Sequence, residues 1–271
     1  MNPALSRPGD VPALRRLWTQ AFGDGDKLLD GFFSRLYRPE DAFVIREDGT
    51  ARAMAFQLPM TVCAGARGWR AAYLYAVATD RAAQGKGYCT RLLDYAGTVL
   101  AERGCKALLL VPGEPGLRDF YRARGYADFS TVDRFEIWAA PETGGAERIE
   151  APEYLELRER ILAGRTYVSC PVPALAFQAR IVELSGGGLY RLSSGETEGC
   201  ACVAVEGAGK AVIYELLWPG EREQGASLAA KAVGAKWAAV RTPGAGEPFS
   251  MVRWLTGAPA LESPYLGIAL D

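Results

Sequence analysis

The sequence predicts an α+β protein in which a mixed central sheet is flanked by helices, built as two copies of one unit. Apolar runs of strand length alternate with segments whose apolar residues recur at three- and four-residue steps. Both halves also repeat one order of elements: helices, an antiparallel meander, a helix and a strand. A small, polar, breaker-rich segment separates the halves. We therefore expect domains at 1–140 and 150–271, joined by a linker at 141–149.

The composition excludes several classes of protein. With 31 basic and 32 acidic residues, the charges nearly cancel, so we expect neither a nucleic acid nor a membrane as partner. No apolar run approaches the roughly 20 residues that span a bilayer, and the N-terminal residues lack the apolar core of a secretion signal. A cytoplasmic location is the resulting expectation.

Cysteine and histidine usage limits the chemistry further. The six cysteines are not spaced as a metal site, so we expect reduced thiols and no metal. The absence of histidine excludes Ser-His-Asp and Cys-His catalysis and any histidine base. Any chemistry must use carboxylates, tyrosines, thiols or backbone groups.

The elements of the first half follow from periodicity and turn residues. Helical spacing predicts four helices, three of which end at a glycine, and the Glu47-Asp48-Gly49 turn predicts a hairpin. In chain order we expect helices at 10–23 and 27–37, strands at 42–46, 51–63 and 73–78, a helix at 88–104, a strand at 106–111, a helix at 116–124 and a strand at 133–138.

The second half repeats this order. We expect helices at 153–162 and 174–184, strands at 189–192, 199–206 and 211–217, a helix at 224–233, and strands at 237–241 and 265–270. The last segment is apolar almost to its end, so we expect it to be docked on the protein.

The loop between the strand ending at Ala78 and the next helix is the strongest indication of function. Gly85 and Gly87 stand where that helix begins, so its unpaired amides and its dipole face the loop. Such a helix start binds a phosphate or pyrophosphate. The loop therefore predicts a nucleotide-like cofactor.

Two motifs resemble the GCN5-related N-acetyltransferase (GNAT) superfamily. Its pyrophosphate loop, Gln/Arg-x-x-Gly-x-Gly/Ala, resembles residues 84–89, with Cys89 at the small final position. A short helix with an aromatic-tyrosine pair, ending in glycine and an aromatic residue, resembles residues 119–126. The strand end at 75–79 and the two-domain length also resemble the tandem-domain enhanced-intracellular-survival type.

The resemblance implies an N-acetyltransferase in which an amine of a small molecule or peptide attacks acetyl-CoA directly. The strand end would hold the pantetheine, the loop amides would bind the pyrophosphate, and basic side chains would add charge. The residues expected at the cofactor are Val77, Ala78, Arg81, Gln84, Gly85, Lys86, Gly87, Tyr88, Cys89 and Thr90.

The resemblance also assigns candidate catalytic residues. Tyr121 would be the general acid that protonates the leaving thiolate. Glu136 is a candidate base, and Asp271 is a second candidate because some tandem-type relatives use a terminal carboxylate. Tyr73 and Tyr75 share one strand face and are candidates for the acceptor site. For each of these residues, a packing or surface role is the alternative reading.

The corresponding junction of the second half differs. Residues 215–227 lack the Gly-x-Gly spacing, and Glu221 and Glu223 stand where the helix begins. Carboxylates there complement the helix dipole and would repel a pyrophosphate. We therefore expect a degenerate second copy without cofactor.

Other readings of the glycine loop fit less well. A P-loop needs a hydroxyl after its lysine, but Gly87 follows Lys86. A dinucleotide-binding loop needs Gly-x-Gly-x-x-Gly, which is absent here. A non-catalytic acyl-CoA-binding or regulatory protein on the same fold remains the alternative, since a fold does not imply an activity.

Overall fold

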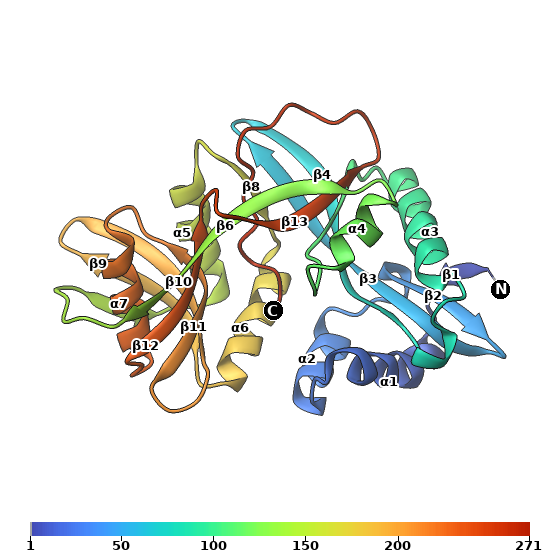
Figure 1. Cartoon of the computed structure of the whole chain (residues 1–271), viewed down its shortest axis with the longest axis horizontal. Helices are drawn as coiled ribbons and strands as arrows, with labels where there is room; N and C mark the ends of the chain where they lie inside the picture. The colour runs from blue at the N-terminus through green and yellow to red at the C-terminus, as the bar shows by residue number, and fades with distance from the viewer. Residues whose placement is uncertain (1) are drawn as a thin grey trace. The chain divides into compact units, whose positions relative to one another are not determined.

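The computed structural model describes residues 2–271 and divides into two compact units that interleave along the chain (Figure 1). Unit 1 comprises the residues up to 61, 69–127 and 251–259. Unit 2 comprises residues 62–68, 128–250 and 260–271. The described strands belong to one mixed sheet, and each unit contains its own run of these strands and its own helices, which confirms the predicted fold class.

The sheet of unit 1 has the strand order β1-β2-β3-β4-β5-β13. β2 runs antiparallel to β3, whereas β4 and β5 are parallel. The strands are β1 (Pro3–Leu5), β2 (Ala42–Glu47), β3 (Thr50–Ala64), β4 (Arg67–Thr79), β5 (Ala107–Leu110) and the last residues of β13 (Glu247–Trp254). The helices are α1 (Val11–Phe22), α2 (Asp26–Arg35), α3 (Tyr88–Glu102) and α4 (Leu117–Arg122), with 3₁₀ turns η1 (Pro8–Asp10), η2 (Pro39–Asp41) and η3 (Arg81–Ala83).

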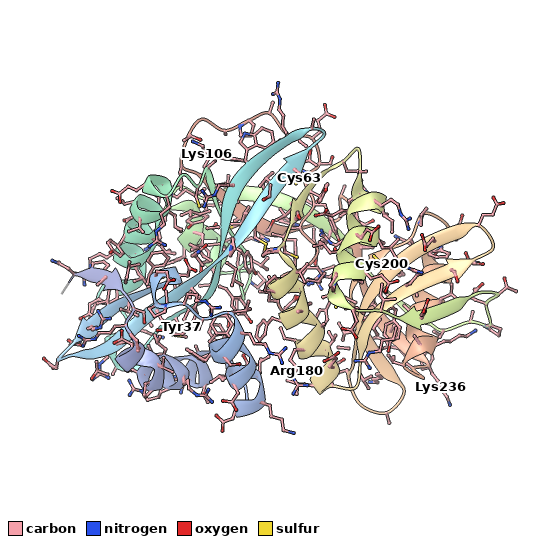
Figure 2. All side chains as sticks on the ribbon, turned by 180° about the vertical axis from the view of Figure 1, so that it is seen from behind. Tyr37, Cys63, Lys106, Arg180, Cys200 and Lys236 are labelled. Carbon is pink, nitrogen blue, oxygen red and sulfur yellow. The ribbon has the colours of Figure 1, made fainter. Side chains whose placement is uncertain are left out.

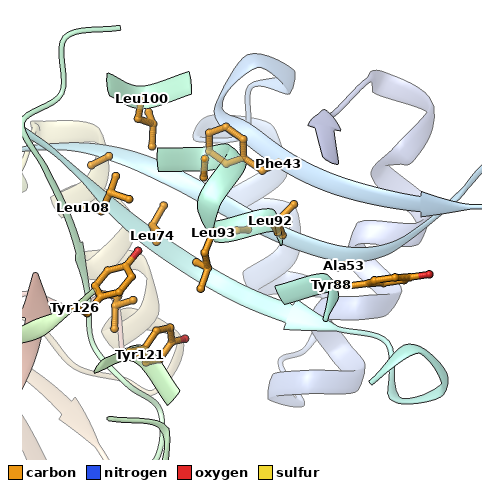
Figure 3. Close-up of a cluster of buried hydrophobic side chains, with 14 of the residues drawn as sticks. Phe43, Ala53, Leu74, Tyr88, Leu92, Leu93, Leu100, Leu108, Tyr121 and Tyr126 are labelled. Carbon is orange, nitrogen blue, oxygen red and sulfur yellow. The ribbon is translucent and has the colours of Figure 1, made fainter. Parts of the chain in front are cut away.

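The core of unit 1 lies between its sheet and α3. Leu92, Leu93 and Leu100 of α3 are buried against strand residues such as Leu74 and Leu108. Figure 3 shows Tyr121 and Tyr126 at one end of this cluster and Tyr88 at the other. Because α3 is fixed along its apolar face, its first turn has a defined position at the end of β4.

The sheet of unit 2 has the order β13-β6-β12-β11-β10-β9-β7, and β8 pairs with the end of β3. Its strands are β6 (Ala127–Trp138), β7 (Gly145–Arg148), β8 (Thr166–Ser169), β9 (Gly188–Ser194), β10 (Thr197–Val205), β11 (Lys210–Leu217), β12 (Trp237–Pro243) and the first residues of β13. Its helices are α5 (Ala151–Leu162), α6 (Val172–Leu184) and α7 (Arg222–Ala232).

A polar network lies inside the core of unit 2. The Arg158 guanidinium pairs with the Glu215 carboxylate at 2.9 Å, and the Tyr154 hydroxyl donates to the same carboxylate at 3.0 Å. All three side chains are buried, as is Cys200 on β10, which is labelled in Figure 2. A methyl group on Gly267 would meet Glu215 and Tyr265, so the network also fixes the path of the C-terminal segment.

The structure corrects several element predictions. Residues 265–270 are buried and docked as predicted, but they form only one isolated bridge, Tyr167 with Tyr265, and no strand. The sequence reading missed β13, because Pro248 and the flanking glycines resemble a loop. It also missed the short strands β1, β7 and β8. The domain boundaries at 140 and 150 stay a prediction.

Candidate active site

Unit 1 contains a pocket of about 470 Å³ between the end of β4, the following loop, the first turn of α3 and helix α4. The predicted cofactor residues Val77, Ala78, Gln84, Gly85, Gly87, Tyr88, Cys89 and Thr90 line it together with Tyr121. The structure therefore brings the two sequence motifs to one cavity, although they are separated along the chain.

The end of β4 separates from β5 at this pocket. The last paired residues are Tyr73 and Leu109, but β4 continues to Thr79. Ala76 has a φ of 48°, a left-handed conformation that is rare for alanine within a strand. Such conformations concentrate at functional sites. The backbone of Val77 and Ala78 thus borders the pocket beyond the last pair with β5.

The loop after β4 is shaped by two glycines. Gly85 and Gly87 have φ values of 77° and 72°, and a methyl group on either would meet no atom within 4 Å. Glycine is needed there for its backbone conformation, and the space beside it is open. Gly87 is the N-cap of α3 and provides no side-chain cap for the amides of the first turn. These amides can bind an anion.

The loop begins from a fixed point at Asp80. Its buried carboxylate accepts hydrogen bonds from the Ala82 amide at 3.1 Å and from Arg52 at 2.9 Å. These two hydrogen bonds lower the pKa of Asp80. The turn η3 is therefore anchored to the sheet immediately before the glycines.

Tyr121 lies on α4 with its ring packed edge-on against Phe120 and Tyr126. Its side chain is 7% exposed, and its hydroxyl has no hydrogen-bond partner among the described residues. Burial raises the pKa of Tyr121 well above the ordinary tyrosine value. The phenol is therefore protonated at neutral pH and can donate a hydrogen bond within the pocket.

The first residues of α3 form another wall of the pocket. Burial raises the pKa of Cys89 to about 11, so this thiol is protonated and serves as a small apolar surface. Tyr88 is buried in the core, with Lys86 and Arg91 near its ring. The Thr90 hydroxyl accepts a hydrogen bond from Arg124.

Two predicted cofactor residues and the two predicted acceptor residues do not line this pocket. Lys86 pairs with Glu47 at 3.0 Å, and the Arg81 amide and guanidinium contact Gln20. Tyr73 and Tyr75 stack on each other, and Tyr75 also packs against Trp18 in the aromatic core of unit 1.

Glu136 and Asp271 belong to unit 2, where both line a second pocket of about 300 Å³. This pocket lies where β11 and β12 separate after their last pair, Ile213 with Val240. The buried Arg241 guanidinium pairs with the Asp271 side chain at 2.5 Å. Asp271 is thereby held against the sheet of unit 2.

Several pocket residues were not predicted as site residues: Thr79, Ala83, Leu117, Phe120 and Arg124. Arg124 could have been found from the sequence, because it lies three residues after Tyr121 and therefore near the same face of the helix expected at 116–124. In the structure it lies in the turn that follows α4. The others depend on how the loop and α4 close the cavity, which local sequence does not specify.

The matching junction of unit 2 is filled by protein. A methyl group on Gly225, in the first turn of α7, would come within 2.5 Å of the Trp218 ring, and Gly220 faces the same indole. Glu221 is the N-cap of α7, and Glu223 pairs with Arg222. The space that is open beside Gly85 and Gly87 is occupied here by an indole.

Comparison with known proteins agrees with this geometry. Residues 4–128 match the family model described as acetyltransferase (GNAT) domain. The predicted resemblance to the GNAT superfamily is confirmed over these residues. No curated protein sequence matches the chain.

Solved structures extend the likeness across 94% of the chain. It is similar to a GCN5-related N-acetyltransferase from Anabaena variabilis, with 15% identity, a TM-score of 0.72 and 73% of that chain covered. It is also similar to a probable N-acyltransferase from Enterococcus faecalis, with 14% identity, a TM-score of 0.70 and 72% covered. It is similar as well to Eis1 from Mycobacterium abscessus, with 13% identity, a TM-score of 0.67 and 74% of that chain covered. At these identities the matches show a shared fold.

Within residues 2–271, no helix is long and apolar enough to cross a membrane. No group of three or more histidine, cysteine, aspartate or glutamate residues in this range could hold a metal ion. The six cysteines are free thiols.

Proposed function

We propose that the protein transfers an acetyl group from acetyl-CoA to a primary amine, at the pocket of unit 1. The main support is the meeting of three features in one cavity: the separated end of β4, the open glycine turn before α3 and the Tyr121 hydroxyl. The GNAT domain at residues 4–128 contains all three features. Each supplies a different part of the chemistry of acyl transfer.

The residues present fit acetyl-CoA. The amides from Gly85 to Cys89 would bind the pyrophosphate, since no side chain caps the start of α3. The backbone of Val77 and Ala78, beyond the last pair with β5, would hold the pantetheine by hydrogen bonds and orient the thioester. Gln84, Tyr88, Cys89 and Thr90 would form the surrounding wall. Arg81 and Lys86 would add charge from outside the pocket.

Tyr121 would act on the leaving group. When an amine attacks the thioester carbonyl, a C–N bond forms, the C–S bond breaks and the thiolate must receive a proton. The Tyr121 phenol is protonated and has no competing partner among the described residues, so it can donate that proton. The Tyr121 phenolate then regains a proton from solvent, and the base releases the amine proton to solvent, which returns the site to its starting state.

A carboxylate would accept the amine proton. Glu136 and Asp271 are the candidates, and both line the pocket of unit 2. Tyr73 and Tyr75 are the candidates for the acceptor site. Tyr73 is buried, so Tyr75, which is partly exposed, would be the one to contact an acceptor. The acceptor would be a small molecule or a peptide carrying a primary amine.

Unit 2 would be a degenerate copy without cofactor. Trp218 fills the space beside the glycines at the start of α7, and acidic residues occupy that helix start. A carboxylate there already complements the helix dipole. Free thiols throughout the chain favour a reducing compartment such as the cytoplasm.

Thiol release from acetyl-CoA, measured with a panel of amines, tests the proposal. The panel should include polyamines, aminoglycosides and a lysine peptide. Turnover with at least one amine, and none without amine, is the expected result. Tight acetyl-CoA binding with no turnover for any amine would instead favour the alternative, a non-catalytic acyl-CoA-binding or regulatory protein.

A further inference from the structure

One charged side chain, Arg124, stands among the described residues that line the pocket of unit 1. The other lining residues are uncharged, and the remaining basic residues of the loop are engaged elsewhere. Lys86 contacts Glu47 with its ammonium group, and Arg81 contacts Gln20. The positive charge inside the cavity therefore comes from the turn that follows α4 rather than from the loop before α3.

The Arg124 guanidinium is held in one orientation. Its Nε donates to the Thr90 hydroxyl at 2.8 Å, and its Nη1 donates to the Phe120 carbonyl. Its Cζ lies 3.4 Å from the centroid of the Phe120 ring, so the guanidinium stacks on that ring. Stacking and two hydrogen bonds reduce the entropy that the side chain would lose on binding a ligand.

Part of this guanidinium is left for a ligand. Among residues 2–271, Nη2 of Arg124 has no hydrogen-bond partner and no carboxylate forms a salt bridge with the side chain. The neighbouring Arg122, in contrast, pairs with Asp119 at 2.8 Å. A partly buried cation without an anion in the protein is suited to binding an anionic ligand.

We propose that Arg124 binds a phosphate group of the nucleotide end of CoA, an inference that rests on the proposed function. Thr90, its hydrogen-bond partner, belongs to the first turn of α3, where the free amides lie. The guanidinium and those amides therefore converge on the same end of the pocket. Guanidinium and phosphate form charge-assisted hydrogen bonds, which are stronger than neutral ones.

A consequence of this arrangement is donor selectivity. Arg124 favours donors that carry the nucleotide phosphates over S-acetylpantetheine, which carries none. Loss of a charge-assisted hydrogen bond should weaken acetyl-CoA binding by about tenfold to a hundredfold. The same loss should leave the affinity for S-acetylpantetheine unchanged.

Titration calorimetry with Arg124→Gln and the matched control Arg122→Gln tests the inference. Arg122 is the last residue of α4, two positions before Arg124, and does not line the pocket. We expect Arg124→Gln to weaken acetyl-CoA binding, to spare S-acetylpantetheine, and to reduce the salt dependence of the affinity by about one charge. Arg122→Gln should match the wild type.

Two further measurements show which phosphate Arg124 contacts and whether the effect of Arg124→Gln comes from misfolding. If the effect of Arg124→Gln persists with 3′-dephospho-acetyl-CoA, the contact is the pyrophosphate; if it disappears, the contact is the 3′-phosphate. Arg124→Lys keeps the charge but loses the planar fork, so it should retain the salt dependence at reduced affinity.

Equal effects of Arg124→Gln on acetyl-CoA and S-acetylpantetheine, or no effect on either, would overturn the role of Arg124. A wild-type protein that binds no acetyl-CoA would contradict the proposed function itself. The two failures are therefore distinguishable.

Discussion

The indole of Trp218 lies against Gly225 so closely that a methyl group on that glycine would come within 2.5 Å of the ring. In unit 1, a methyl group on Gly87 would meet nothing within 4 Å. The two glycines stand at the starts of α7 and α3, respectively. One glycine accommodates the protein's own side chain, and we infer that the other leaves room for a ligand.

Alanine at these two glycines should therefore have different effects. Gly225→Ala should lower the free energy of unfolding by about 1–3 kcal/mol through overpacking and leave acetyl-CoA affinity unchanged. Gly87→Ala should lower the free energy of unfolding by about 1–2 kcal/mol, because alanine is strained in the left-handed backbone conformation of Gly87, and it should also weaken acetyl-CoA binding. Thermal unfolding with and without acetyl-CoA measures both. Equal loss of affinity in the two variants would contradict this reading.

Tyr121→Phe should lower kcat by about a hundredfold or more, because the phenol that protonates the leaving thiolate is removed. Its acetyl-CoA affinity should stay within about twofold, since the ring remains. Tyr126→Phe is a suitable control, because the Tyr126 hydroxyl is buried without a partner in the described part of the chain. The assignment is wrong if the two variants have the same kcat.

The carboxylate of Asp80 should make stability depend on pH in the acid range. Its pKa is lowered in the folded state, so its contribution is complete above the unfolded value of about 3.9 and is lost as the pH falls through the folded pKa. Asp80→Asn should be less stable at pH 7 by about 1 kcal/mol, and this difference should shrink below pH 4. Denaturant unfolding between pH 2 and 7 gives the comparison. A difference that does not change with pH would rule out this contribution.

Deleting Asp271 should abolish turnover while sparing acetyl-CoA binding, if this residue supplies the base. Asp271 is paired with Arg241, so the deletion also removes an ion pair of unit 2. Arg241→Lys controls for that pair, since it weakens the contact with Asp271 and keeps the Asp271 carboxylate. Unchanged turnover after the deletion would eliminate Asp271 as the base and leave Glu136.

Much of the fold could be predicted because periodicity and turns are local properties. The helix with Leu92, Leu93 and Leu100 on one face, and the turn at Asp48 and Gly49, follow directly from spacing and residue type. The strand β13 could not be predicted in this way. It pairs with β5, which lies far away in the sequence, and it contains Pro248, a residue that is unfavourable inside a strand.

The candidate site could be predicted in part for a similar reason. The glycine turn and the tyrosine helix are continuous motifs, so their residues could be listed from the sequence. The positions of Lys86 beside Glu47 and of Arg124 beside Thr90 depend on contacts across the fold. Those contacts decide which basic residue contributes charge to the pocket.

The stoichiometry of acetyl-CoA binding tests the central claim most directly. Titration calorimetry of the full chain should give one site, with binding weakened by Gly87→Ala and unaffected by Gly225→Ala. Two sites per chain, or one site that is insensitive to Gly87→Ala, would contradict an acetyl-CoA pocket confined to unit 1.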